Sequence, residues 1–282
     1  MALWSPTRRE VLLGGAGLAV TGGAVEGLLI EPRGLDTTHH ALPIVGLHPG
    51  LEGLVVAQLT DVHLHKVHAA ARRTSELIDA LRPDVVVLTG DIIQSPKDVA
   101  NLVAWLPEVR GQLATFATLG NWELWGGLRP GPLAEVYARV GAQLLVNEVA
   151  MVERGGGGLA FIGLDDPREG QPDPTPVLRQ LGADLPAIWM VHEPGYVDEL
   201  GLDPALSGVR PPDLLLSGHT HGGQVRSPWG AIITPPGSGR FVQGWYRDTW
   251  GPLYVSRGVG TSLAPVRLLC RPEVAIFRLH RA

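Results

Sequence analysis

The chain of 282 residues contains very little cysteine and very little lysine. Cys270 is its only cysteine, which excludes an internal disulfide framework and every metal site built from several thiolates. Lys66 and Lys97 are the only lysines, and the formal net charge is -5 at pH 7. This charge balance argues against nucleic-acid binding, which depends on neutralising phosphates. An anionic ligand therefore needs another source of positive charge, such as a metal held by His, Asp, Glu or Asn.

Charged residues are also scarce, at 18%, whereas hydrophobic residues make up 45% of the chain. This composition excludes a disordered or linker-like protein. A chain of this length can bury a large core, in one large domain or two small ones. Neither an internal repeat nor a clean linker is visible, which favours one domain.

The N-terminal region has no apolar run long enough to cross a bilayer. The uncharged stretch 11–25 is shorter than the roughly 20 residues that a membrane-spanning helix needs. Arg8 and Arg9 directly precede this stretch, an arrangement that resembles the twin-arginine export signal, with Val11 where an aromatic residue is usual. The alternative is an ordinary surface pair before a helix.

We therefore expect residues 1–30 to be a signal or an N-terminal anchor that engages the export machinery. The segment can be cleaved after Ala24 or retained. The protein would then be exported and periplasmic, cell-wall or membrane-associated, with peripheral membrane contact as one option.

Residues 31–53 are rich in Pro, Gly and His without a sustained period, so we expect a lead-in segment, with order beginning at Leu54 and one domain over 54–282. Short, often β-branched apolar runs predict buried strands, and stretches with a helical apolar period alternate with them. The strands are expected at 54–59, 85–88, 113–119, 187–191 and 213–216, and the helices at 70–81, 99–109 and 132–140. This alternation predicts an α/β fold with a largely buried sheet.

Each of these five strands runs directly into a group of side chains that can bind a metal. The groups are Asp61 with His63, Asp91, Asn121, His192, and His219 with His221. In an open α/β sheet, ligands bind beyond the carboxyl ends of the strands. Five loops are therefore expected to converge on one site.

The donors at these strand ends are three carboxylate or amide oxygens and four imidazoles, without a thiolate. Seven donors exceed one tetrahedral zinc site and suit two metal ions that share a carboxylate. Mixed N and O ligation fits Mn, Fe, Zn or Co. Asp61 and His63, like His219 and His221, are two residues apart, which in extended backbone sends both side chains to the same side.

The whole series resembles the calcineurin-like metallophosphoesterases, from about Leu54 to the C-terminus. Within that family, His192-Glu193-Pro194 and the run 218–224 resemble its exported or membrane-associated bacterial branch. The resemblance implies a four-layer α/β/β/α sandwich. It also implies a first ion held by Asp61, His63, Asp91 and His221, and a second held by Asp91, Asn121, His192 and His219, with Asp91 bridging.

The implied activity is hydrolysis of a phosphodiester, pyrophosphate or phosphomonoester by a hydroxide that bridges two divalent ions. Asp91, Asn121 and His192 are the residues expected to be catalytic. The substrate would be a phosphate ester of the cell envelope, with a lipid-linked compound as one option. Two alternatives stay open: a metal-binding envelope protein with weak or no catalysis, and a nucleotide phosphodiesterase.

Trp122 departs from the family pattern, which commonly carries His directly after the Asn. Tryptophan cannot act as a general acid. The substrate's leaving group could need little help, His65 or His68 could substitute as the acid, or catalysis could be lost. Trp122 and Trp125 could instead form an apolar wall for a lipid or sugar, or simply pack.

Several other polar residues are not assigned to the site. Glu123 and Glu193 are interpreted as turn residues or as supports for the metal ligands. Arg257 and Arg267 could contact phosphate or form salt bridges, and we leave both out. Cys270 lies in an apolar stretch and is expected in the core.

Overall fold

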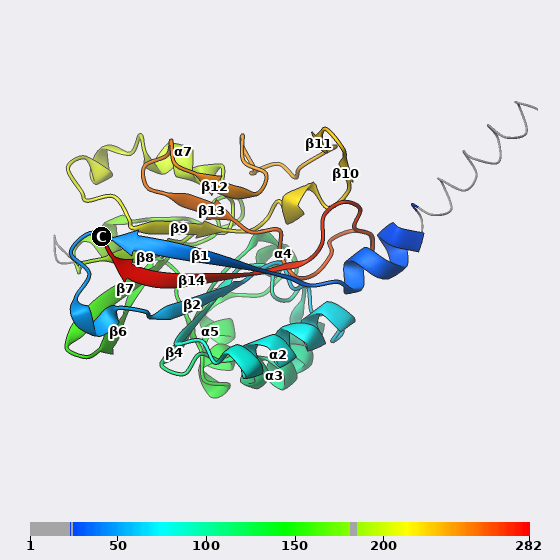
Figure 1. Ribbon diagram of the computed structural model, residues 1–282, viewed down its shortest axis with the longest axis horizontal. Helices are drawn as coiled ribbons and strands as arrows, with labels where there is room; N and C mark the ends of the chain where they lie inside the picture. Colours follow the sequence, from blue (N-terminus) through cyan, green and yellow to red (C-terminus); the bar gives the residue numbers. More distant parts are fainter. Residues whose placement is uncertain (1–22, 24, 181–184) are drawn as a thin grey trace, which may run out of the picture.

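The computed structural model describes residue 23 and residues 25–180 and 185–282 (Figure 1). The Arg8-Arg9 pair and most of the expected signal lie outside the described residues. Among the described helices, none combines the length and apolar character that crossing a membrane requires.

Two six-stranded sheets form the centre of the fold. The first has the order β1 (Asp36–Ile44), β14 (Glu273–Arg281), β2 (Val55–Leu59), β3 (Val85–Thr89), β4 (Ala114–Thr118) and β5 (Gln143–Leu144). The second has the order β12 (Gly244–Tyr246), β13 (Leu253–Val255), β9 (Leu214–Ser217), β8 (Ala187–Met190), β7 (Gly157–Gly163) and β6 (Glu148–Arg154). Strands β2 to β5 run parallel, as do β7, β8, β9 and β13. Two sets of parallel strands therefore end in loops that can share one site.

Helices cover the outer face of each sheet. The first sheet packs against α2 (Ala69–Leu81), α3 (Val99–Trp105) and α5 (Pro130–Arg139) through one buried apolar cluster. The second sheet packs against α6 (Thr175–Leu178) and α7 (Tyr196–Leu200) through another.

A third buried cluster lies between the two sheets. Phe116 of the first sheet packs there against Phe161 of the second, with ring centroids 5.0 Å apart. Residues alternate along each strand between this cluster and the outer one, as Val85 and Val86 of β3 do. The predicted four-layer α/β/β/α sandwich is confirmed.

The expectation that order begins at Leu54 is wrong. Strand β1 lies within the expected lead-in and pairs in parallel with β14 over all nine of its residues. Leu42 and Ile44 are buried between the sheets, whereas most of the strand is only partly covered. The strand lies at the edge of the sheet, so its apolar period is weak and it tolerates Pro43. The domain boundaries at residues 30 and 53 stay predictions.

Candidate metal centre

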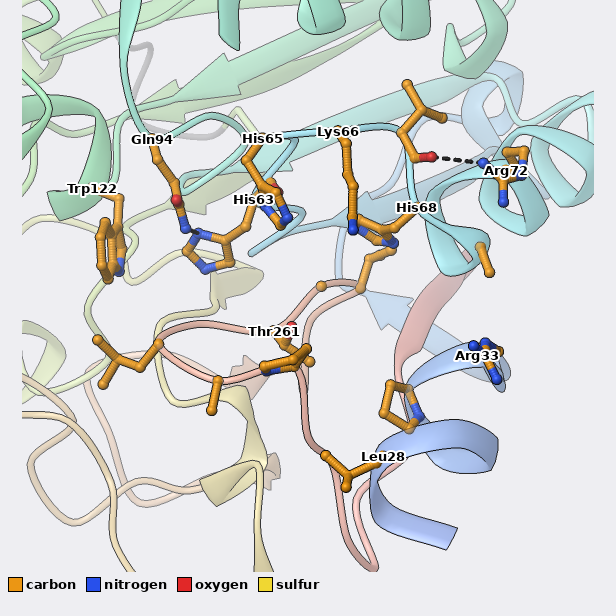
Figure 2. A pocket seen from close by; sticks show the side chains of 18 residues that line it. Leu28, Arg33, His63, His65, Lys66, His68, Arg72, Gln94, Trp122 and Thr261 are labelled. Carbon is orange, nitrogen blue, oxygen red and sulfur yellow. Dashed lines mark hydrogen bonds between the residues drawn. The ribbon is translucent and has the colours of Figure 1, made fainter. Parts of the chain in front are cut away.

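The carboxyl ends of β2, β3, β4, β8 and β9 meet at one end of the sandwich, beside a groove of about 990 Å³ (Figure 2). The seven predicted donors all lie at these strand ends. None of these residues is more than 5% exposed: Asp61, His63, Asp91, Asn121, His192, His219 and His221. The structure therefore buries seven polar groups together at the strand ends.

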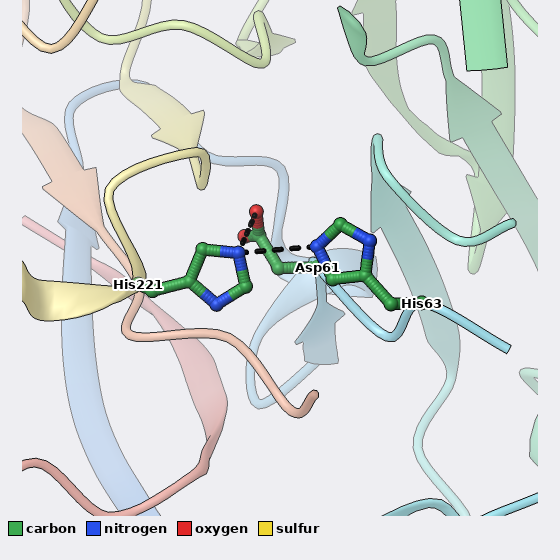
Figure 3. Close-up of side chains that lie close together, drawn as sticks. All are labelled: Asp61, His63 and His221. Carbon is green, nitrogen blue, oxygen red and sulfur yellow. Dashed lines mark hydrogen bonds and ion pairs between the residues drawn. The ribbon is translucent and has the colours of Figure 1, made fainter. Parts of the chain in front are cut away.

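Asp61, His63 and His221 form the first group of potential ligands (Figure 3). The Nε2 atoms of His63 and His221 lie 3.1 Å apart, and the two rings stack with an interplanar angle of 15°. Oδ1 of Asp61 lies 3.4 Å from Nε2 of His221. Two imidazole nitrogens and a carboxylate oxygen thus converge on one point.

Asp61, Asp91 and His192 form the second group, so the two groups share Asp61. Oδ2 of Asp91 lies 3.2 Å from Nε2 of His192 and 3.9 Å from Nε2 of His63. Asp91 is therefore within reach of both groups, as a bridging carboxylate must be.

Asn121 and His219 face each other beside the second group. Oδ1 of Asn121 lies 3.1 Å from Nδ1 of His219, and Nε2 of His219 lies 2.8 Å from the carbonyl oxygen of Pro236. With Nε2 donating to that carbonyl, Nδ1 carries the lone pair toward Asn121. The structure brings all seven predicted residues together, and their assignment to two ions stays a prediction.

The backbone of the ligand loops differs from the extended conformation expected at Asp-x-His and His-x-His. Five of the seven residues have a positive φ: Asp61 (52°), His63 (51°), Asp91 (55°), His219 (69°) and His221 (49°). The left-handed region is uncommon for residues other than glycine and accumulates at functional sites. Asp61 and His63 therefore reach one donor group from left-handed rather than extended backbone.

Glycines surround the Asp61 carboxylate closely. A Cβ at Gly218 would lie 2.3 Å from Oδ2 of Asp61, and a Cβ at Gly258 would lie 2.6 Å from Cβ of Asp61. Gly258 also has a φ of +69°. No larger residue fits at either position without moving the carboxylate.

Burial keeps three of the histidines neutral. It lowers the pKa of His63 and of His219 to about 4, and it lowers the pKa of His221 well below its ordinary value. At neutral pH these imidazoles offer lone pairs, which is the form that binds a metal.

Asp91 and His192 behave instead as an ion pair. Burial opposes charge on both, but the Asp91 charge raises the pKa of His192 well above its ordinary range, and His192 helps lower the pKa of Asp91 to about 2. Burial raises the pKa of Asp61 to about 7. The proton on His192 thus provides the positive charge beside Asp91 and Asp61. A metal cation can replace this proton.

The donor set fits divalent ions. Oδ2 of Asp91 and Nε2 of His192 are buried and have no hydrogen-bond partner of good geometry within the described part of the chain. The Nδ1 atom of His192 lies 2.8 Å from the carbonyl oxygen of Thr89. A ring nitrogen that donates its proton to a backbone carbonyl leaves the lone pair on the other nitrogen, which is then free to bind a metal. This arrangement is typical of metal-binding histidines.

Glu123 supports the loops that carry the metal ligands, which is one of the two roles that the sequence suggested. Its buried carboxylate accepts four backbone N–H groups, from Asp91 (3.0 Å), Ile92 (2.6 Å), Ile93 (3.1 Å) and Gly120 (3.0 Å). Burial and the charge of Asp91 raise its pKa to about 8, against the effect of these N–H groups. Glu123 therefore ties the loop after β3 to the loop after β4. A glutamate two residues after Asn121 was its only signal in the sequence.

Arg257 and Arg267 do not line the groove. Arg257 forms ion pairs with Glu273 (3.1 Å) and Asp36 (3.3 Å). Arg267 is fully buried and donates to the backbone carbonyls of four residues, Arg257, Gly258, Gly260 and Cys270. It holds together the loop that supports Asp61 and His221. Cys270 is buried, as predicted, with Sγ 3.1 Å from the carbonyl oxygen of His221.

Trp122 lines the groove beside His63. Its ring meets His63 edge-on at 5.7 Å and Trp125 at 5.5 Å. Of the two suggested substitute acids, His68 caps α2, with Nδ1 accepting from Ala71 N and Nε2 lying 2.8 Å from the Val62 carbonyl. Because both ring nitrogens of His68 are engaged, only the exposed His65 stays a candidate.

The sequence of residues 54–223 matches the family of calcineurin-like phosphoesterases. The chain belongs to this family. It is 31% identical to the metallophosphoesterase YkuE of Bacillus subtilis (strain 168) over an alignment of 287 residues that covers 97% of each chain. It is also 31% identical to the phosphodiesterase YaeI of Escherichia coli (strain K12), with 70% of this chain and 71% of YaeI covered.

Among solved structures, the chain resembles a 5'-nucleotidase precursor from Thermus thermophilus. The identity is 18% and the TM-score 0.48, over 81% of this chain and 54% of that chain. The family match and the sequence relatives place the chain among the metal-dependent phosphoester hydrolases.

Proposed function

We propose that the protein is a binuclear metal-dependent enzyme that hydrolyses a phosphodiester or pyrophosphate, or a phosphomonoester, of a cell-envelope or lipid-linked compound. The observation that carries this proposal is the pair of donor groups that share Asp61, with Asp91 within reach of both. Two divalent ions held there would supply Lewis acidity toward phosphate oxygens and lower the pKa of water.

The residues around the ions would position them and exclude bulk water. His192 and His219 each have one ring nitrogen beside a backbone carbonyl oxygen, which fixes the direction of the other nitrogen. Glu123 fixes the loops that carry Asp91 and Asn121. The chain has a formal net charge of -5 at pH 7, and the ions would add positive charge that attracts the anionic substrate.

The lining of the groove favours a substrate that carries both charged and apolar groups. Lys66, Arg33 and Arg72 line the groove together with the apolar Leu28, Val259 and Leu263. Trp122 lines the groove near His63 and Gln94 (Figure 2). An amphiphilic phosphodiester fits this combination, and YaeI carries the name phosphodiesterase.

A substrate panel tests the proposal. We expect the purified chain, supplied with Mn²⁺ or Zn²⁺, to hydrolyse bis(p-nitrophenyl) phosphate and to lose this activity when a chelator removes the metal. Nucleotide diesters in the same panel test the nucleotide phosphodiesterase alternative. Absence of turnover across phosphomonoesters, diesters and pyrophosphates with both metals would contradict the proposal.

Replacement of Trp122 by His is expected to restore a general acid beside the site. The predicted effect is a gain of about 10²–10⁴ in kcat for diesters with a poor leaving group, and little change for p-nitrophenyl esters. Trp122→Phe is the control, because it keeps an aromatic ring without an acid. Steady-state kinetics of alkyl and p-nitrophenyl diesters measure the difference. An inactive wild type that gains nothing from Trp122→His favours a non-catalytic, metal-binding envelope protein.

Export is the second part of the proposal. It is supported by Arg8-Arg9 before the apolar stretch 11–25. In a bacterial host with twin-arginine export, a C-terminally tagged chain is expected in the envelope fraction, and Arg8→Lys with Arg9→Lys should retain it in the cytoplasm. Immunoblots of the fractions measure the shift. An unchanged distribution would contradict a twin-arginine signal.

A further inference from the structure

Exposed apolar side chains gather beside the mouth of the groove. Among the described residues, nine of the fifteen large exposed hydrophobic side chains belong to three short segments. We call these nine the apolar rim: Val25, Leu28, Leu29, Ile30, Trp229, Ile232, Ile233, Leu263 and Leu269. Trp229 and Leu263 are 93% and 92% exposed. Scattered exposed hydrophobics are normal, but a concentration of this kind marks an interaction surface.

The three segments of the rim are held against one another. The helical turn η1 (Glu26–Ile30) meets the loop 261–270, because Arg267 N donates to the Gly27 carbonyl at 2.9 Å. The hairpin of β10 (Arg226–Ser227) and β11 (Gly230–Ala231) meets the same loop, because Arg226 N donates to the Leu268 carbonyl at 2.9 Å. The rim is therefore one continuous part of the surface, at the end of the molecule shown on the right in Figure 1.

The rim adjoins the candidate metal centre. The β10–β11 hairpin follows His221 by only a few residues. The carbonyl oxygen of Pro236, which comes after the hairpin, lies 2.8 Å from Nε2 of His219. Leu28 and Leu263 line the same groove as His63 (Figure 2). A surface that covered the rim would face the opening of the groove.

The charges around the rim favour an anionic partner. Segments 225–235 and 261–271 contain neither aspartate nor glutamate, and they carry the partly exposed Arg226 and the exposed Arg271, whereas Arg267 is buried. Glu26 in η1 is the acidic residue of the three rim segments. Lys66, Arg33 and Arg72 are exposed beside them in the groove, and its described lining includes no acidic residue. Exposed Trp and Leu with nearby Arg and Lys are typical of helices and loops that lie in a lipid interface.

The N-terminal part of the chain enters the fold at the rim. Strand β1 runs antiparallel to β2, so its first residue, Asp36, lies at the same end as the ligand loops. The apolar stretch 11–25 leads directly into η1. A signal or anchor in a membrane would thus hold the rim close to the bilayer.

We infer that the apolar rim docks the protein on an anionic lipid bilayer, with the groove opening toward the lipid surface. This inference rests on the envelope location proposed above. The rim would insert Trp229, Ile232 and Ile233 among the lipid headgroups, while the neighbouring arginines and lysine contact anionic phosphates. The enzyme would then take its phosphate ester from the lipid surface.

Vesicle binding of the full chain tests the inference. The triple variant Trp229→Ser, Ile232→Ser, Ile233→Ser is compared with a matched control, Val45→Ser, Met151→Ser, Leu202→Ser, whose sites are exposed apolar residues outside the rim. Sedimentation with vesicles of equal phosphatidylglycerol and phosphatidylcholine should show at least about a tenfold lower partition coefficient for the rim variant only. Both variants keep residues 1–22, so any contribution of that segment to vesicle binding is the same in the two partition coefficients. Equal partitioning of both variants would overturn the inference.

Fluorescence quenching by brominated lipids gives a second readout. Wild type should be quenched on binding, and Trp229→Phe should lose a measurable part of that quenching while still binding. Unchanged quenching in Trp229→Phe would overturn insertion of the hairpin. A dimer of the wild type in lipid-free sedimentation that the rim variant abolishes would assign the rim to a second copy of the chain and overturn the lipid assignment.

Hydrolysis of soluble bis(p-nitrophenyl) phosphate is measured for the same variants. The rim variant should retain the wild-type rate, because its three residues do not line the groove. Lost vesicle binding with retained hydrolysis supports docking. Absence of hydrolysis in every variant, with vesicle binding still sensitive to the rim, refutes the proposed activity and leaves docking in place.

Discussion

Asp91→Asn is expected to abolish hydrolysis and to weaken metal binding. Asp91, like Asp61, is a carboxylate within reach of both donor groups, and its Oδ2 is buried without a good hydrogen-bond partner among the described residues. An amide has the same shape but no charge, so it cannot balance divalent ions. We expect a fall of at least about a thousandfold in kcat/KM, corresponding to several kcal/mol of lost transition-state stabilisation.

Two measurements that do not depend on activity check this prediction. Elemental analysis should find fewer ions per chain in Asp91→Asn than in the wild type. Added metal should raise the Tm of the chelator-treated wild type, because an ion that binds only the folded state stabilises it, and this increase should shrink in the variant.

Asp248→Asn is the matched control for Asp91→Asn. Asp248 carries the same charge but is exposed and pairs with Arg240 at the surface. Its replacement should change neither metal content nor rate. If Asp91→Asn bound metal normally and kept its activity, both the ligand assignment and the proposed mechanism would be wrong.

Glu123→Gln is expected to destabilise the fold and the metal centre together. Each carboxylate oxygen accepts two backbone N–H groups. An oxygen can accept whether or not the carboxyl is protonated, whereas the amide nitrogen of Gln cannot. Two buried N–H groups therefore lose their acceptor in any orientation of the Gln side chain. The expected loss in the free energy of unfolding is about 3–5 kcal/mol.

Thermal unfolding and metal titration measure the effect of Glu123→Gln. A loss of this size lowers Tm by roughly 10 °C in a protein of this size. Metal affinity should also fall in the folded fraction, because the loops that carry Asp91 and Asn121 are no longer tied together. Glu135→Gln, at an exposed pair with Arg139, should stay within a degree or so of wild type. A Tm of Glu123→Gln close to the wild-type value would contradict the anchoring role.

The central strands could be predicted because they are fully buried and locally distinct. Every residue of β2, β3, β8 and β9 is buried, so each of these strands is a nearly continuous apolar run in the sequence. Each run ends abruptly at a polar residue or glycine. The polar residues that follow each run made the site visible before any tertiary contact was known.

Features that depend on distant contacts were not predictable in the same way. Strand β1 has a weak apolar pattern and becomes a strand by pairing with β14, more than 200 residues later. Glu123 reaches N–H groups about 30 residues away. Arg267 gave no sign of burial in the sequence, yet its charge is stabilised by carbonyls within a folded loop. The residues next to each of these positions in the sequence do not indicate which distant groups will contact them.

The left-handed ligand residues imply a conflict between stability and chemistry. A residue with a side chain in this conformation is disfavoured by roughly 1–2 kcal/mol relative to ordinary backbone. Glycine would relieve that penalty at positions 61, 63, 91, 219 and 221, and would remove the ligand. A bound ion stabilises only the folded state, so metal binding would offset this backbone penalty in the wild type and could not do so in the glycine variants.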